Sequence, residues 1–82
     1  MMTLKRAIAL RISNLMVKNK IPSQYQVCKN AGLTESTLRA VINEEHQSVN
    51  ILTLFRICEG LGVSIQEFFN DDLFKQENLD LD

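Results

Sequence analysis

The chain has 82 residues, of which 45% are hydrophobic and 23% are charged, and its formal net charge is −1. This length predicts a single domain, near the lower limit for a core that folds without disulfides or metals. The three glycines and single proline argue against a turn-rich β-sandwich and against disorder. No apolar run approaches the roughly 20 residues of a membrane span. Arg11 interrupts the apolar start and no cleavage site follows it, so we expect a cytoplasmic protein without a membrane partner.

The charges are unevenly divided along the sequence. Residues 1–60 contain eight basic and four acidic residues, a net charge of +4, whereas residues 61–82 contain one basic and six acidic residues, a net charge of −5. A mildly basic body with an acidic end is compatible with a face that binds nucleic acid. We therefore divide the chain into a domain at 1–70 and an acidic C-terminal tail at 71–82. The tail is expected either to be frayed or to fold only against a partner.

The first two helices are predicted by an apolar stripe and by the residues between them. Apolar side chains recur at helical spacing through residues 3–19. Pro22 ends this helix, because the residue before a proline avoids helical geometry. Ser23 then caps a second helix, and Gln26 completes a capping box with it. Gly32 ends the second helix, since glycine adopts the left-handed conformation without a steric penalty.

Three further helices are predicted by the same kinds of start and stop signals. Their expected N-caps are Thr34, Asn50 and Ser64. Their expected ends are Asn43, the "GLG" stretch at 60–62 and Asn70. Residues 43–49 form a polar connector between the third and fourth helices. Because no stretch alternates over a strand length, the predicted fold class is all-α, with five short helices around one core.

The sequence offers no chemistry typical of an enzyme. Cys28 and Cys58 lie within apolar patterns and are interpreted as small buried thiols. His46 stands alone and supplies no further ligand, so no metal site is predicted. No set of catalytic residues can be assembled, and we expect no enzymatic activity, no cofactor and no small-molecule substrate.

The second and third helices form an abrupt corner around Gly32, which is typical of a helix-turn-helix. Such a corner needs a small residue where the helices cross, and Cys28 occupies that place. Leu38 and Val41 anchor the third helix to the core. Its opposite face is then free to enter a DNA major groove, which is about 12 Å wide and admits one helix.

The stretch "SQYQVCKNAGLTESTLRAVI" at 23–42, followed by "LTLFRICEGLGVSIQEFF" at 52–69, resembles the helix-turn-helix domain of phage repressor and Cro proteins, the XRE family. The resemblance covers about residues 4–70. It implies a compact five-helix, phage-repressor-like DNA-binding fold. It also implies a sequence-specific transcriptional regulator, a repressor from a bacterium, phage or mobile element, that inserts helix 34–43 in the major groove of double-stranded DNA. The connector departs from the family because it lacks the usual glycine.

The resemblance also implies roles for particular residues. Those expected to contact bases are Glu35, Ser36, Thr37, Arg39 and Ala40. Those expected to contact the DNA backbone are Ser23, Gln24 and Asn43, with Lys18, Lys20 and Lys29 added because of their charge. Chemically, Arg39 can bind the O6 and N7 atoms of guanine, Glu35 can accept from the amino group of cytosine, and Ala40 can contact a thymine methyl group.

The resemblance further implies a two-fold homodimer. Three phenylalanines near one end exceed what a single short helix can bury, so Phe69 and Phe74 are candidates for the dimer interface. An alternative function remains open from the sequence, namely a protein-binding module on the same scaffold, such as an antitoxin-like or anti-regulator partner. The weak net charge and the acidic tail favour this alternative.

Overall fold

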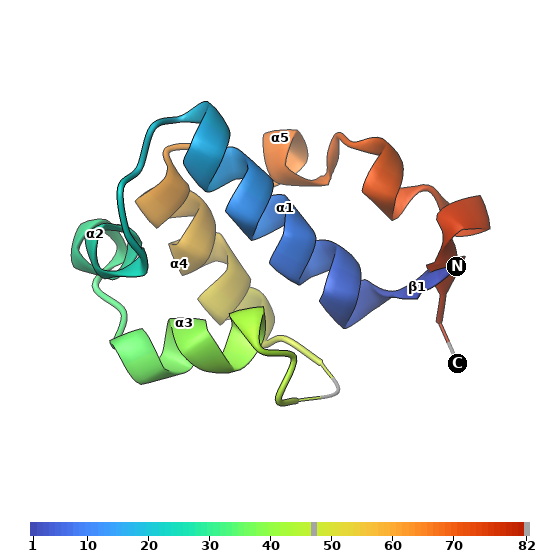
Figure 1. The fold of residues 1–82 in the computed structure, drawn as a ribbon, viewed down its shortest axis with the longest axis horizontal. Coiled ribbons are helices and arrows are strands. Elements are labelled where there is room, and N and C mark those ends of the chain that lie inside the picture. Colours follow the sequence, from blue (N-terminus) through green and yellow to red (C-terminus); the bar gives the residue numbers. More distant parts are fainter. Residues whose placement is uncertain (47, 82) are drawn as a thin grey trace.

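A computed structural model describes residues 1–46 and 48–81 of the chain as five α-helices with short ordered segments at both ends (Figure 1). The helices are α1 (Leu4–Lys18), α2 (Gln24–Ala31), α3 (Glu35–Ile42), α4 (Ile51–Leu61) and α5 (Ile65–Phe69). The predicted all-α, five-helix fold is confirmed. Gln47 of the predicted connector and Asp82 of the predicted tail lie outside the described residues. In the described part, no helix is both long enough and apolar enough to cross a membrane.

Each helix begins where a side-chain oxygen accepts a hydrogen bond from an amide of the first turn, which satisfies an otherwise unpaired donor. The four predicted N-caps of α2 to α5 are confirmed; they are Ser23, Thr34, Asn50 and Ser64. Thr3 caps α1 by accepting from the amide of Arg6 at 3.3 Å. The capping box predicted for α2 is only half formed, because the side-chain amide of Gln26 donates to Asn30 at 2.9 Å.

The core lies between α1, α2, α4 and α5, and α3 closes it along one edge (Figure 1). Its buried members are Ile8, Ile12, Leu15, Val27, Cys28, Leu38, Leu54, Ile57, Cys58, Leu61 and Phe68. Gly60 lies inside α4 and does not end it; a β-carbon there would lie 2.9 Å from Cγ1 of Val27 and 3.0 Å from Cβ of Ala31. The absence of a side chain therefore lets α2 and α4 pack closely. Gly62, with φ of 79°, is the residue that ends α4.

The two ends of the chain lie side by side (Figure 1). Two short 3₁₀ helices, η1 (Asp72–Phe74) and η2 (Gln76–Asn78), lead to the strand β2 (Leu79–Asp80), which pairs in parallel with β1 (Met2–Thr3). Each strand has only two residues, too few for the alternation by which sequence reasoning finds strands. Leu79 is buried. The expectation that the tail is frayed or folds only against a partner is wrong, because the tail packs on its own chain.

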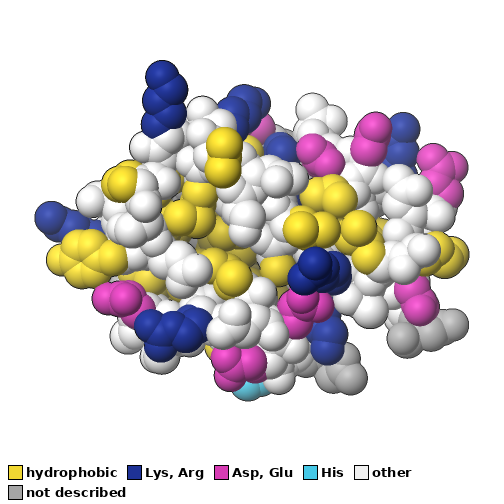
Figure 2. All heavy atoms as spheres, in the orientation of Figure 1, with side chains coloured by type: hydrophobic (Ala, Val, Ile, Leu, Met, Phe, Trp, Pro, Cys, Tyr) yellow, Lys and Arg dark blue, Asp and Glu magenta, His cyan; other side chains and the backbone are white. Residues whose placement is uncertain are grey.

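An aromatic cluster joins α5 to the tail. The ring of Phe68 is fully buried, and its centroid lies 5.2 Å from that of Phe69 and 5.8 Å from that of Phe74. The rings of Phe69 and Phe74 meet edge to face at 4.8 Å, a favourable arrangement for aromatic pairs. Figure 2 shows hydrophobic side chains at the surface between α1 and the segment after α5.

Candidate nucleic-acid interface

The corner between α2 and α3 is built by Gly32. This residue has φ of 67° and ψ of 32°, the left-handed conformation that the sequence predicts. Its amide and the amide of Leu33 both donate to the carbonyl of Cys28, the second at 3.1 Å. These bonds give donors to a carbonyl group in the last turn of α2, as is usual where a helix ends in a left-handed residue. The chain then enters α3 after only one more residue, Thr34.

The inner face of α3 is fixed to the core. Leu38 is fully buried, and Val41 and Ile42 pack against the core cluster. The predicted anchoring by Leu38 and Val41 is confirmed. Because α3 has only eight residues, its stability depends on this packing more than on its own helix propensity.

Cys28 lies under the start of α3, where a small residue was predicted. Its thiol is buried and donates to the carbonyl of Thr34 at 3.6 Å. Burial raises the pKa of the Cys28 thiol, the Glu35 carboxylate raises it further, and the Arg39 guanidinium lowers it. The thiol therefore stays protonated. It serves as a compact packing group and as a weak hydrogen-bond donor to the carbonyl of Thr34 in the turn.

The outer face of α3 carries polar side chains. Glu35, Ser36 and Arg39 are exposed, and Thr37 and Ala40 are half-buried. The carboxylate of Glu35 and the guanidinium of Arg39 are 3.9 Å apart, and both side chains are more than half exposed. Such a surface pair is worth at most about 1 kcal/mol and leaves both groups free to change partners. The structure therefore brings all five predicted base-contacting residues to one short helix with its polar side outward.

The hydroxyl groups at the start of α3 form a small network. The Thr34 hydroxyl lies 2.8 Å from that of Thr37 and 3.2 Å from that of Ser36, and it also accepts from the amide of Thr37. A hydroxyl can donate or accept, so this network can present either a donor or an acceptor to a ligand. The start of α3 therefore has adaptable hydrogen-bonding groups at its surface.

A surface hollow of about 350 Å³ lies along α3, and we call it the α3 groove. Its walls come from α3, the connector and the start of α4; the lining residues are Ser36, Thr37, Ala40, Val41, His46, Ser48, Val49, Asn50 and Thr53. Hydroxyl and amide groups predominate among its polar atoms. Sequence reasoning missed Ser48, Asn50 and Thr53 as neighbours of the recognition residues, because only the tertiary fold brings the start of α4 beside α3.

The predicted backbone contacts fall into two groups. Ser23 and Gln24 are exposed at the start of α2, Lys29 is exposed on the same helix, and Asn43 is exposed at the end of α3. These four residues lie on the elements of the helix-turn-helix or next to them. The second group consists of Lys18 and Lys20. Lys18 is the last residue of α1 and Lys20 follows it, and α1 ends on the side of the molecule away from α3 (Figure 1).

The connector is fixed by an unpredicted contact. Glu44 has a positive φ of 58° and its carboxylate accepts from the guanidinium of Arg6 at 3.0 Å. Its amide donates to the carbonyl of Val41, and the amide of Glu45 donates to that of Ala40, which completes the end of α3. Glu44 therefore occupies a left-handed position, which glycine would adopt without a steric penalty.

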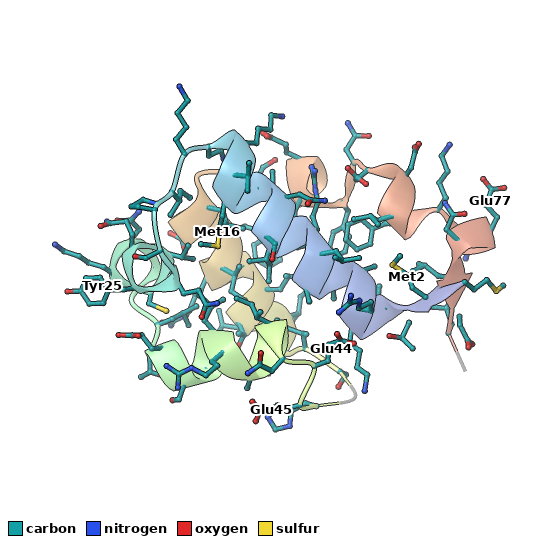
Figure 3. All side chains as sticks on the ribbon, in the orientation of Figure 1. Met2, Met16, Tyr25, Glu44, Glu45 and Glu77 are labelled. Carbon is teal, nitrogen blue, oxygen red and sulfur yellow. The ribbon has the colours of Figure 1, made fainter. Side chains whose placement is uncertain are left out.

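The charges around α3 are mixed. Figure 2 shows acidic and basic side chains alternating over α3 and the connector on the face in view, and Figure 3 places Glu44 and Glu45 at the connector, with Tyr25 projecting from α2. Among the described residues, no group of three or more histidine, cysteine, aspartate or glutamate side chains could hold a metal ion. The arrangement can therefore offer directed hydrogen bonds to a ligand, with little excess positive charge on this face.

Comparison with known proteins agrees with this geometry. The family model described as the Cro/C1-type HTH DNA-binding domain matches residues 11–72. The fold is similar to that in the crystal structure of the prophage Lp1 protein 11, with a TM-score of 0.78 and 24% identity over 93% of this chain and 99% of that one. No curated protein is significantly similar in sequence. With the corner at Gly32 and the outward face of α3, the match establishes that the chain belongs to the Cro/C1-type helix-turn-helix family of DNA-binding domains.

Proposed function

We propose that the chain is a sequence-specific transcriptional regulator that acts as a repressor by placing α3 in the major groove of an operator. The observation that carries this proposal is the outward polar face of α3, anchored from behind by buried Leu38 and flanked by the α3 groove. A helix held in this way can approach base edges without leaving the core. Occupation of the operator would then block access by RNA polymerase.

Base recognition is assigned to the residues on α3. Arg39 would donate to O6 and N7 of a guanine, and Glu35 would accept from the amino group of a neighbouring cytosine. Their 3.9 Å separation means that Arg39 gives up only a weak ion pair when it turns to DNA. Ser36 and Thr37 would donate or accept at either base type, and Ala40 would contact a thymine methyl group.

Backbone contacts are assigned to the residues that flank α3. Ser23 and Gln24 present the start of α2, where amide groups and the helix dipole favour a phosphate. Lys29 lies on α2, before the turn, and Asn43 lies at the end of α3. The α3 groove offers further hydroxyl groups from Ser48 and Thr53, whereas Lys18 and Lys20 would contribute only through longer-range attraction because they lie farther from α3.

The experiment that tests this function begins with selection of bound duplexes from a random library by the full chain. Binding to the selected duplex is then measured at several salt concentrations. We expect the logarithm of the affinity to fall linearly with the logarithm of salt, by about 0.9 for each phosphate neutralised. Little dependence of the affinity on salt would instead indicate a complex held by apolar contacts, as expected for a protein-binding module.

Arg39→Ala tests the assignment of base contacts. The variant should weaken binding to the selected duplex by roughly 5- to 150-fold, the equivalent of about 1–3 kcal/mol, and should relax the preference at one base pair. Lys75→Ala is a matched control, because Lys75 is also exposed and paired with an acidic side chain, Asp72 at 3.3 Å, but lies in the tail. Equal effects of the two substitutions would overturn the assignment.

A further inference from the structure

The single histidine of the chain, His46, lies beside the recognition residues. It is an exposed residue of the connector. It lines the α3 groove together with Ser36, Thr37 and Ala40, three of the residues to which base contacts are assigned. In the sequence His46 is an isolated residue of a polar connector, so this neighbourhood is a product of the tertiary fold.

The charged side chains around His46 come from the connector and from α1. On the connector, Glu44 is already engaged, because its carboxylate accepts from the guanidinium of Arg6 at 3.0 Å. Glu45 is exposed at the same connector (Figure 3). On α1, Lys5 lines an adjacent hollow and not the α3 groove. An exposed carboxylate such as that of Glu45 is screened by water and holds an imidazolium only weakly.

Helices α3 and α4 add no charge to the α3 groove. Their described lining residues carry hydroxyl, amide or apolar groups. The charged residues Glu35 and Arg39 of α3 lie 3.9 Å from each other and do not line the groove. A protonated His46 would therefore be the only positive charge among the described residues of the groove, and it would stand next to the bound duplex.

The chemistry of imidazole links this position to pH. Histidine is the side chain that ordinarily changes its charge between about pH 5 and 8. The charged ring has two N–H donors, whereas the neutral ring has one donor and one acceptor. A phosphate oxygen is a charged acceptor and therefore binds the protonated ring in preference. When α3 fills the major groove, a residue beside the helix faces the sugar-phosphate wall of the groove.

We propose that His46 is a DNA-backbone contact that takes up a proton when the operator binds, so that the affinity for DNA depends on pH. The proposal rests on the DNA-binding function proposed above. Because the complex holds this proton more tightly than the free protein does, the affinity is highest in acid and falls as the pH rises through the range in which histidine titrates. A neutral complex would show no such dependence.

The test measures the affinity of the full-length chain for a selected duplex between about pH 5.5 and 7.5 at constant ionic strength. The wild-type affinity should fall roughly three- to tenfold over this range, as one charge-assisted hydrogen bond is lost. His46→Gln keeps a polar side chain of similar size without the charge, and its affinity should stay constant. His46→Lys carries a permanent charge, so at the upper pH it should bind as tightly as the wild type does at the lower pH.

Glu45→Gln is the matched control. Protonation of a carboxylate near DNA would also strengthen binding in acid, so this variant, which keeps His46, should retain the wild-type dependence on pH. The salt dependence identifies the phosphate. At the lower pH the slope of log affinity against log salt should be steeper for the wild type than for His46→Gln by about 0.9, and at the upper pH the two slopes should agree. Circular dichroism melting checks that each variant folds.

Four outcomes would overturn the proposal. The wild-type affinity does not change with pH, His46→Gln keeps the full dependence, or Glu45→Gln abolishes it. In the fourth, His46→Gln relaxes the preference at one base pair and leaves the salt slope unchanged, which would place the imidazole on a base. Salt-dependent binding that is indifferent to pH would leave the proposed function standing while this inference fails. Failure to select any duplex would remove both.

Discussion

The guanidinium of Arg11 donates from Nε to the backbone carbonyl of Phe68 at 2.8 Å, in the interior of the protein. The same side chain donates to the carbonyl of Glu67 at 2.8 Å and to the carboxylate of Asp71 at 3.1 Å. Arg11 is only 8% exposed. It thus gives the carbonyl of Phe68 a donor, adds a second donor to the carbonyl of Glu67, which also accepts from the amide of Asn70 at 3.2 Å, and ties the first residue of the tail to α1.

Replacement of Arg11 should be strongly destabilising. Arg11→Met keeps the apolar stem but removes the hydrogen bonds that the guanidinium donates to the carbonyl groups of Phe68 and Glu67 and to the carboxylate of Asp71. Loss of two hydrogen bonds from a charged donor to these carbonyl groups, each worth about 1.5–3 kcal/mol, should lower the free energy of unfolding by about 3–6 kcal/mol. Urea denaturation followed by circular dichroism measures the loss.

Asp71→Asn serves as the control for the charge alone. The side chain of Asp71 is 32% exposed, so its charge is partly screened by water. Asparagine can still accept from the amide of Leu73, as Asp71 does at 2.9 Å. The loss of stability should stay below about 1 kcal/mol. A loss as large as that of Arg11→Met would show that the ion pair, and not the carbonyl contacts, makes Arg11 important.

Gly60→Ala should separate α2 from α4. A β-carbon at this position would clash with the backbone carbonyl of Val27 and lie 3.0 Å from Cβ of Ala31. Alanine favours a helix over glycine by about 1 kcal/mol, but overpacking against a backbone atom costs about 1–3 kcal/mol or more. Because the carbonyl cannot move aside as a side chain can, we expect a net loss of stability. Thermal melting measures it, and unchanged or increased stability would contradict the close packing described here.

The local features of the fold were predictable, because each depends on residues within one helical turn. Ser23, Thr34, Asn50 and Ser64 cap the helices as expected, since a capping oxygen meets amides only two or three residues ahead. The left-handed Gly32 is equally local. Of the candidate site, the outward face of α3 follows from the same helical spacing that buries Leu38.

The features that were missed depend on residues far apart in the sequence. Arg11 looks like a solvent-exposed interruption of an apolar stripe until α5 and the tail are placed over it. The pairing of Met2 with Leu79 has no local signal, because two residues cannot show a strand period. The α3 groove likewise forms only when the start of α4 is brought beside α3. Tertiary packing, and not local propensity, decides these contacts.

The stability of the protein should fall as the pH rises above 9. Burial raises the pKa of the Cys58 thiol from 9.0 to about 11. Between these values the unfolded chain loses this proton while the folded chain keeps it, so ionisation favours unfolding. Cys58 contributes its full stabilisation below pH 9 and loses it progressively towards pH 11. Cys58→Ala should show a smaller decrease in urea midpoint over this range than the wild type, and parallel curves would contradict the assignment.

Glu44 should be better replaced by glycine than by alanine. Both substitutions remove the 3.0 Å contact with Arg6, which is worth at most about 1 kcal/mol at the surface. Only glycine also removes the strain of a φ of 58°, since a β-carbon in the left-handed region costs roughly 1–2 kcal/mol. We therefore expect Glu44→Gly to exceed Glu44→Ala in free energy of unfolding by about 1 kcal/mol. This difference should persist in concentrated salt, where the ion pair is screened. Equal stability of the two variants in urea denaturation would mean that the end of α3 does not require the left-handed conformation.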